Sequence, residues 1–240
     1  MGPEGATPGA SERVHVRRLD VADTLRWSWY ALTDRPELAA LTLAVQSLSV
    51  VTTLGISGES ATDAPAIADW VWPVSVGYLL ALAAAWGVYF LTAADAVAEG
   101  SRARSLSERA RIAARRLPAL AVAAVAVWLA VWVGVALFVV PGIYLFVRLV
   151  LVYPACVVDR KGPLSGLTAG WRASRGSGWK IFGVTAAYVV LTYGSGILTG
   201  LFGGTSSVLG SAVSAVFGSV LGPVYGLALG HLYLEASRNT

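Results

Sequence analysis

Residues 117–158 read LPALAVAAVAVWLAVWVGVALFVVPGIYLFVRLVLVYPACVV, a run in which Arg148 is the only charged residue. A helix that crosses a bilayer needs about 20 apolar residues, because it rises about 1.5 Å per residue through a hydrocarbon core of roughly 30 Å. The run is long enough for two such helices, and Pro141 and Gly142 supply a turn near its middle. It therefore predicts two spans, at about 117–139 and 142–158.

Three other uncharged runs extend this prediction along the chain. Residues 38–58 and 70–94 are each long enough for one span, and residues 181–234 are long enough for two, divided by the turn GLFGGTSS at 200–207. With 56% hydrophobic and 13% charged residues, the composition excludes an ordinary soluble domain. We therefore expect an all-α, polytopic membrane helical bundle with six transmembrane helices in three hairpins. The remaining predicted spans are at about 37–56, 70–94, 180–199 and 208–234.

These spans place a membrane domain at residues 19–236, between a flexible cytoplasmic N-terminus (1–18) and a short C-terminal tail (237–240). Basic residues orient it, since 17 of the 18 Lys and Arg residues lie in four polar stretches, while the connection at 55–69 and the two short turns contain none. The bias in Lys and Arg sets orientation. We expect a multi-pass protein of the cell membrane with both termini cytoplasmic.

The same distribution indicates which partners to expect. The basic residues lie beside the spans and are not gathered on a soluble face, so the pattern predicts contact with the lipid bilayer and with anionic lipids at the inner leaflet, and no nucleic-acid partner.

Each pair of spans is preceded by a stretch with the pattern of an amphipathic helix, which favours helices lying on the inner leaflet. Asp20 is available as an N-cap for the first helix, and Ser105 and Glu108 form a capping-box pattern at the start of the second. The expected apolar stripes are Val21/Leu25/Trp29/Leu32, Leu106/Ala110/Ala113 and Leu164/Leu167/Trp171.

The second span of each pair ends with an acidic residue: Asp95, Asp159 or Glu235. Together with the amphipathic stretches, these residues predict three repeated units, each made of an interfacial helix and two spans.

Arg148 is the charge that a membrane makes expensive. It lies eleven residues before Asp159, which places it roughly 16 Å from the inner boundary, near the midplane. An Arg at that depth costs about 2.5–3.5 kcal/mol and needs a partner, but no carboxylate lies at a comparable depth. Two interpretations follow: a structural Arg bonded to carbonyls and hydroxyls at a helix kink, or an Arg that contacts a ligand or a lipid phosphate.

The first span carries a polar stripe at Thr42, Gln46, Ser49 and Thr53. Hydrogen bonding between helices is the ordinary role of such a stripe, and lining a pore is the alternative. Gln46 is the stripe residue best able to bond Arg148 if the first and fourth spans touch.

Small residues recur at every fourth position of the last span, at Gly210, Ser214, Gly218, Gly222, Gly226 and Gly230. Such a stripe lets another backbone approach closely, either within the bundle or across a homodimer. Pro223 is expected to kink this helix.

Catalytic motifs are missing from the sequence. His15 and His231 have no metal-ligand spacing to another donor, and the chain contains neither a P-loop nor a G-x-S-x-G elbow. We expect no catalytic site, metal or cofactor, and therefore no enzyme activity.

Residues 140–183, VPGIYLFVRLVLVYPACVVDRKGPLSGLTAGWRASRGSGWKIFG, resemble the signature region of a prokaryotic family named after the membrane domain of glycerophosphoryl diester phosphodiesterases. The counterparts of its motif are Pro141 and Gly142, Arg148, Asp159, Trp171 and Gly176, with Gly170 before Trp171 where the family usually has Ser. The resemblance implies a six-span layout. In some members this domain precedes a soluble phosphodiesterase, but this chain ends soon after its sixth span, so we expect no phosphodiesterase activity.

Three functional hypotheses follow. The first is a non-enzymatic scaffolding, lipid-interacting or regulatory membrane module, which could pair as a homodimer or with another membrane protein. The second is a small transporter or permease subunit that binds an anion or lipid headgroup at Arg148. The third is a membrane partner of a separate phosphodiesterase.

Overall fold

The computed structural model describes residues 16, 18–57, 66–98, 104–205 and 207–239. The predicted flexible N-terminus, 1–18, lies outside these residues except at positions 16 and 18. The described chain is helical apart from one antiparallel pair of two-residue strands. Its elements are α1 (Val21–Thr33), α2 (Glu37–Thr53), β1 (Ile56–Ser57), β2 (Ala66–Ile67), α3 (Val71–Val97), α4 (Leu106–Leu137), α5 (Val139–Leu149), α6 (Val152–Val158), α7 (Pro163–Ala173), α8 (Gly178–Leu201) and α9 (Val208–Arg238).

Five helical segments of the described chain are long and apolar enough to cross a membrane. They are α3, α4, the segment Val139–Val158 formed by α5 and α6, α8 and α9. The predicted first span forms α2, which has 17 residues and covers about 25 Å, a little less than a hydrocarbon core of roughly 30 Å. The structure therefore supports a membrane-embedded, all-helical protein with five such segments and a shorter apolar helix.

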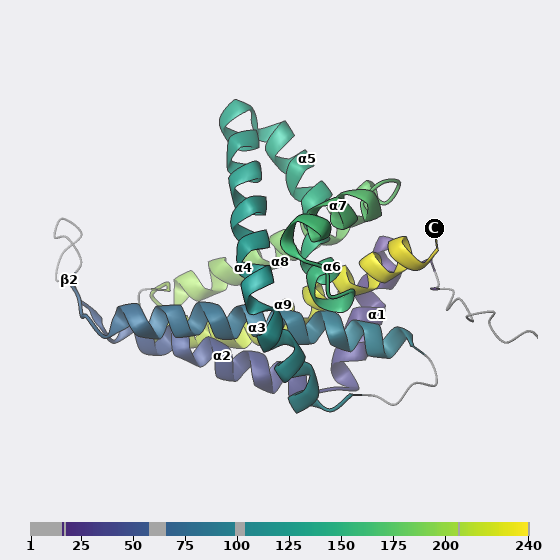
Figure 1. The fold of residues 1–240 in the computed structure, drawn as a ribbon. Coiled ribbons are helices and arrows are strands. Elements are labelled where there is room, and N and C mark those ends of the chain that lie inside the picture. Colours follow the sequence, from purple (N-terminus) through teal and green to yellow (C-terminus); the bar gives the residue numbers. More distant parts are fainter. Residues whose placement is uncertain (1–15, 17, 58–65, 99–103, 206, 240) are drawn as a thin grey trace, which may run out of the picture.

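Consecutive helices pack in pairs, α2 with α3, α4 with α5 and α8 with α9, and the middle pair points in another direction (Figure 1). α2, α3 and α9 pack against one another and α8 packs against α9, with the β1–β2 connection and the α8–α9 turn at the same end (Figure 1). The hairpin of α4 and α5 crosses α3 and projects away from this bundle, so its turn lies apart from the other two (Figure 1). The helices therefore pair in the predicted order, while the arrangement of six spans in three hairpins stays a prediction.

The glycine stripe of α9 packs against α2 and α3. A Cβ atom on Gly226 would lie 2.6 Å from Cδ2 of Tyr89, and a Cβ on Gly230 would lie 2.6 Å from Cβ of Ala93. On the side of α2, a Cβ on Gly218 would lie 2.5 Å from Nε2 of Gln46, and one on Gly222 would be in ordinary contact with Thr42 at 3.8 Å. The glycines thus let α9 approach two neighbouring helices within the same chain, which is the first of the two roles expected for the stripe.

Polar groups of α2 bond to tyrosines of α3. The hydroxyls of Thr42 and Tyr89 are 2.5 Å apart, and the Tyr78 hydroxyl donates to Oε1 of Gln46 at 2.8 Å. These are interhelical hydrogen bonds of the kind predicted for the polar stripe. The hydroxyls of Ser49 and Thr53 instead donate to carbonyls of their own helix.

The three predicted acidic residues at the helix ends all bind basic residues. Asp95 accepts from Nε of Arg104 at 2.7 Å and from Nε of Arg109 at 2.9 Å, and the Arg109 and Asp95 side chains are only 4% and 6% exposed. Removing one partner of such a buried pair typically costs about 3–5 kcal/mol, because the other charge remains buried.

The other two acidic residues connect segments that are distant in the sequence. Asp159 accepts from the Tyr233 hydroxyl at 2.5 Å and from Nη2 of Arg238 at 3.3 Å. Glu235 accepts from Nζ of Lys180 at 2.7 Å and from the backbone N–H of Leu19. These bonds bring the basic segments together around the C-terminal end of α9.

The first and last described residues of the chain, Val16 and Asn239, meet at the same end. The side chain of Asn239 accepts from the backbone N–H of Val16 and donates to its carbonyl. α9 continues to Arg238, so the predicted tail at 237–240 begins within a helix. It also passes through Pro223 as a single continuous helix.

The helices predicted to be interfacial bury much of their predicted stripes, and in α1 Leu32 is buried while Val21 and Leu25 pack against the core. α1 buries Thr24 and Ser28, whose hydroxyls donate to carbonyls one turn earlier, whereas Trp29 of the predicted stripe is 49% exposed. Asp20 occupies the N-cap position but makes no side-chain capping bond. Small polar residues occupy the face of α1 that packs against α9, because they leave room for that helix. The periodicity of apolar residues does not reveal this contact.

The second predicted interfacial helix is not separate from its span. The capping box of Ser105 and Glu108 is present, and from there α4 runs without interruption through Pro118 to Leu137. The third, α7, buries Gly166 and Gly170 against α6, while Leu164 is exposed.

The reversal between α4 and α5 comes earlier than predicted. Phe138 has an extended backbone (φ −164°, ψ 151°), and Pro141 and Gly142 lie in the first turn of α5. Pro is tolerated there because the first N–H groups of a helix have no intrahelical acceptor. Gly142 lets α5 approach α4 closely, since a Cβ atom at this position would lie 2.8 Å from the backbone nitrogen of Val135.

A pair of Gly→Ala substitutions tests the packing of α9. Gly230→Ala should lower the midpoint of thermal unfolding in detergent, because its Cβ would crowd Ala93 and overpacking costs about 1–3 kcal/mol. Gly196→Ala in α8, where no other atom would lie within 4 Å of the added Cβ, should leave the midpoint unchanged or raise it. Equal shifts for the two variants would contradict the close approach of α9 to α3.

Candidate anion-binding site

Arg148 lies in the last turn of α5, where two aromatic rings hold its guanidinium. Its Nε donates to the hydroxyl of Tyr144, one turn earlier, at 3.0 Å. The guanidinium carbon lies 5.2 Å from the centroid of the Tyr144 ring and 5.6 Å from that of Trp171 on α7. A cation over an aromatic face is stabilised by about 0.5–2 kcal/mol, more when water is excluded. Within the described residues, the guanidinium of Arg148 therefore contacts one hydroxyl and two aromatic rings, and it bonds to no carbonyl.

One nitrogen of this guanidinium remains unbonded. Nη1 of Arg148 is buried and has no hydrogen-bond partner within the part of the chain that the structure describes. A buried donor without an acceptor costs about 1–3 kcal/mol, more when it is charged.

The helix breaks directly after Arg148. α5 ends at Leu149 and the helix resumes at Val152, so the kink expected beside a structural Arg is present.

A hollow of about 390 Å³ lies beside Trp171 and carries two more arginines. Its lining residues are Leu149, Leu167, Thr168, Trp171, Arg172 and Arg175. Arg172 and Arg175 are exposed and form no ion pair within the described chain, and no Asp or Glu lines the hollow. Arginine suits the binding of phosphate and carboxylate groups, because its planar fork donates two parallel hydrogen bonds.

α7 reaches this position because two glycines let it approach α6. A Cβ on Gly170 would lie 2.6 Å from the backbone nitrogen of Val152, and Gly166 faces Cys156. Pro163 at the first helical position fixes the start of α7. The next residue after Gly170 is Trp171, which is thereby held over Arg148 with the rings of Tyr144 and Trp171 at 84° to each other.

The structure does not bring the other predicted site residues to Arg148. Gln46 bonds to Tyr78 in the α2–α3 contact, and Asp159 bonds to Tyr233, Arg238 and Lys161. Pro141 and Gly142 lie at the opposite end of α5, and the glycine stripe lies on α9.

Tyr144, Arg172 and Arg175 belong to this site, although the sequence did not predict that they would lie together with Arg148. The spacing of Tyr144 and Arg148, four residues apart on one helix, is a signal that could have paired them. The approach of Trp171 could not be predicted in this way, because it depends on the packing of α7 on α6.

Neither a metal site nor a family assignment accompanies this geometry. Within the described residues, no three His, Cys, Asp or Glu side chains are grouped so that they could hold a metal ion. Comparisons of the chain with protein-family models, curated proteins and solved structures find no match. The resemblance to the glycerophosphoryl diester phosphodiesterase membrane domain therefore stays a prediction.

Arg148→Lys tests the ring contacts, because lysine keeps the charge but loses the planar guanidinium and the Nε donor. We expect a lower midpoint of thermal unfolding in detergent, equivalent to about 1–2 kcal/mol. Arg175→Lys, at an exposed position without an ion pair in the described chain, is the matched control and should unfold like the wild type. Identical unfolding of all three proteins would show that the contacts of Arg148 do not stabilise the fold.

Proposed function

We propose that the protein is a non-enzymatic module of the cell membrane that binds an anionic lipid headgroup. The observation that carries this proposal is the hollow beside Trp171, where Arg172 and Arg175 are free of carboxylates in the described chain and Arg148 contacts the same indole. A lipid phosphate would find two exposed cationic side chains there, with an apolar floor formed by Leu149 and Leu167.

The proposal includes six crossings, with both termini in the cytoplasm. α2 would provide the sixth crossing, since it packs along α3 and α9 and its flanking residues can extend its short apolar length. The bonds of Lys180 to Glu235 and of Arg238 to Asp159, which gather basic segments around the C-terminal end of α9, support this orientation. Basic residues beside spans favour the cytoplasmic side of a membrane, where they meet anionic lipids. Arg172 and Arg175 would then lie at the inner leaflet.

Transport of an anion is the second candidate. The unbonded Nη1 of Arg148 favours it, since an anionic substrate would supply the acceptor that the described residues do not. Arg148 lines neither the hollow beside Trp171 nor an apolar cavity of about 500 Å³ between α3, α4 and α9, which makes surface binding of a headgroup the better supported of the two. A role as membrane partner of a separate phosphodiesterase is a further proposal that rests on the sequence resemblance alone.

Two double variants with equal loss of charge test headgroup binding. Arg172→Ala/Arg175→Ala should weaken binding of phosphatidylglycerol, measured by native mass spectrometry of protein released from nanodiscs, by about tenfold. Binding of phosphatidylcholine should not change.

The control is Arg111→Ala/Arg115→Ala, which removes two exposed arginines from α4. It should keep most of the phosphatidylglycerol binding. If both double variants lose the lipid equally, general surface charge accounts for binding and the site at Trp171 does not.

A further inference from the structure

A second, larger cavity lies where α4 diverges from α3. The two helices are in contact at Gly87 and Ala113, where a Cβ on the glycine would lie 2.7 Å from the alanine Cβ. Beyond this point α4 projects away from the bundle of α2, α3 and α9 (Figure 1). A wedge of about 500 Å³ remains between α3, α4, α5, α6 and α9, within the size range of pockets that hold small molecules.

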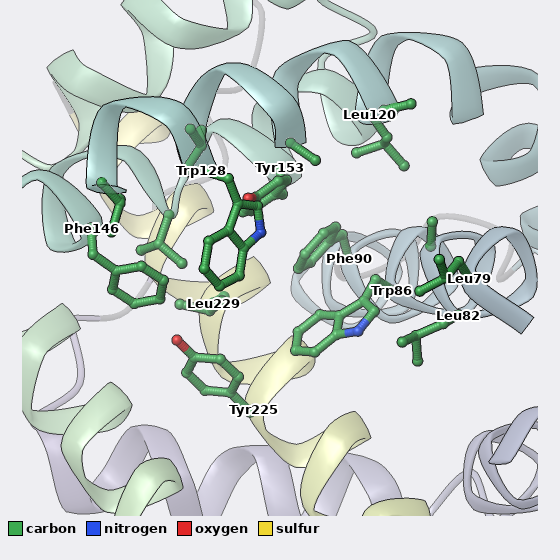
Figure 2. Close-up of a pocket in the computed structure, with 16 residues that line it drawn as sticks. Leu79, Leu82, Trp86, Phe90, Leu120, Trp128, Phe146, Tyr153, Tyr225 and Leu229 are labelled. Atoms are coloured by element: carbon green, nitrogen blue, oxygen red, sulfur yellow. The ribbon is translucent and has the colours of Figure 1, made fainter. Parts of the chain in front are cut away.

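The walls of this cavity are almost entirely apolar. Figure 2 shows Trp128 and Phe146 on one side, Trp86 and Phe90 on the other, and Tyr225 of α9 below them. Such walls exclude a charged or strongly polar occupant, because burying an unpaired polar group costs several kcal/mol.

One hydroxyl in the lining is free to bond an occupant. The Tyr225 hydroxyl already pairs with that of Thr185 at 3.0 Å. Tyr153 of α6 also lines the cavity (Figure 2), and within the described residues its hydroxyl has no hydrogen-bond partner. The cavity therefore suits a long apolar group that carries a hydrogen-bond acceptor at one end.

The mouth of the cavity opens toward the surface that would face lipid. Leu79 of α3 and Trp128 of α4 line the cavity and are 60% and 57% exposed, and both belong to helices long and apolar enough to cross a membrane. An occupant can therefore enter sideways from the hydrocarbon phase. Tyr153 lies six residues before Asp159, roughly 9 Å from the inner boundary, so the acceptor would lie in the inner half of the bilayer.

We propose that this cavity binds one acyl chain of a glycerolipid, with the ester carbonyl accepting a hydrogen bond from Tyr153. The site is separate from the arginine hollow, because Phe146 faces the cavity while Arg148 lies on the opposite side of α5, about 200° further around the helix. The inference consequently does not rest on headgroup binding.

A zwitterionic probe keeps the two sites distinguishable. Phosphatidylcholine with a diazirine in one acyl chain, reconstituted with the protein in nanodiscs, should crosslink on illumination to the cavity-lining residues of α3 and α4, located by peptide mass spectrometry. Ala124→Trp places an indole in the cavity and should reduce this crosslinking at least fivefold. Val125→Trp, at the neighbouring exposed position, should label like the wild type.

The hydroxyl is tested with Tyr153→Phe, a change that leaves the ring in place. Wild type should label about threefold to tenfold more with the ester-linked probe than with an ether-linked analogue that lacks the carbonyl. Tyr153→Phe should remove this preference.

Crosslinking that Ala124→Trp leaves unchanged would overturn the proposal. So would an ester preference that survives in Tyr153→Phe. Crosslinked dimers with no lipid adduct at the cavity would assign it to a second copy of the chain, and would equally overturn the acyl-chain site.

Discussion

The close approach of α9 to α3 is the constraint on which the other contacts depend. Gly226 and Gly230 remove the side chains that would keep the two helices apart, and Tyr89 and Ala93 occupy the space. In lipid, where helices gain little from the hydrophobic effect, such backbone proximity is a main source of helix association. It also fixes the C-terminal end of α9, from which Tyr233 and Glu235 reach α6, α8 and the N-terminal segment. One helix thereby connects segments from the beginning, middle and end of the chain.

Features set by spacing along the sequence could be predicted. The uncharged runs after residue 70 correspond to the long apolar helices, Ser105 and Glu108 form the expected capping box, and the polar face of α2 bonds to a neighbouring helix. Each of these depends on residues within one or two turns of one another, or on the length of a run. Local rules of helix geometry are sufficient for them.

Features set by tertiary packing could not be predicted in this way. Pro141 and Gly142 suggested a turn, but the chain reverses at Phe138, because proline fits the first turn of a helix and Gly142 is needed for contact with α4. Arg148 contacts Tyr144 and Trp171 instead of Gln46, since α7 rather than α2 lies beside it. The divergence of α4 from α3, which creates the apolar cavity, likewise has no signature in hydropathy.

Orientation links these contacts to the proposed function, because headgroup binding at Trp171 requires the basic end of the protein to face the cytoplasm. Single cysteines in a Cys156→Ala background test this directly. With a membrane-impermeant maleimide on intact cells, Thr205→Cys, in the α8–α9 turn, should be labelled, whereas Thr33→Cys, at the end of α1, should be labelled only after permeabilisation. Labelling of Thr33→Cys in intact cells would contradict the cytoplasmic placement of the basic end.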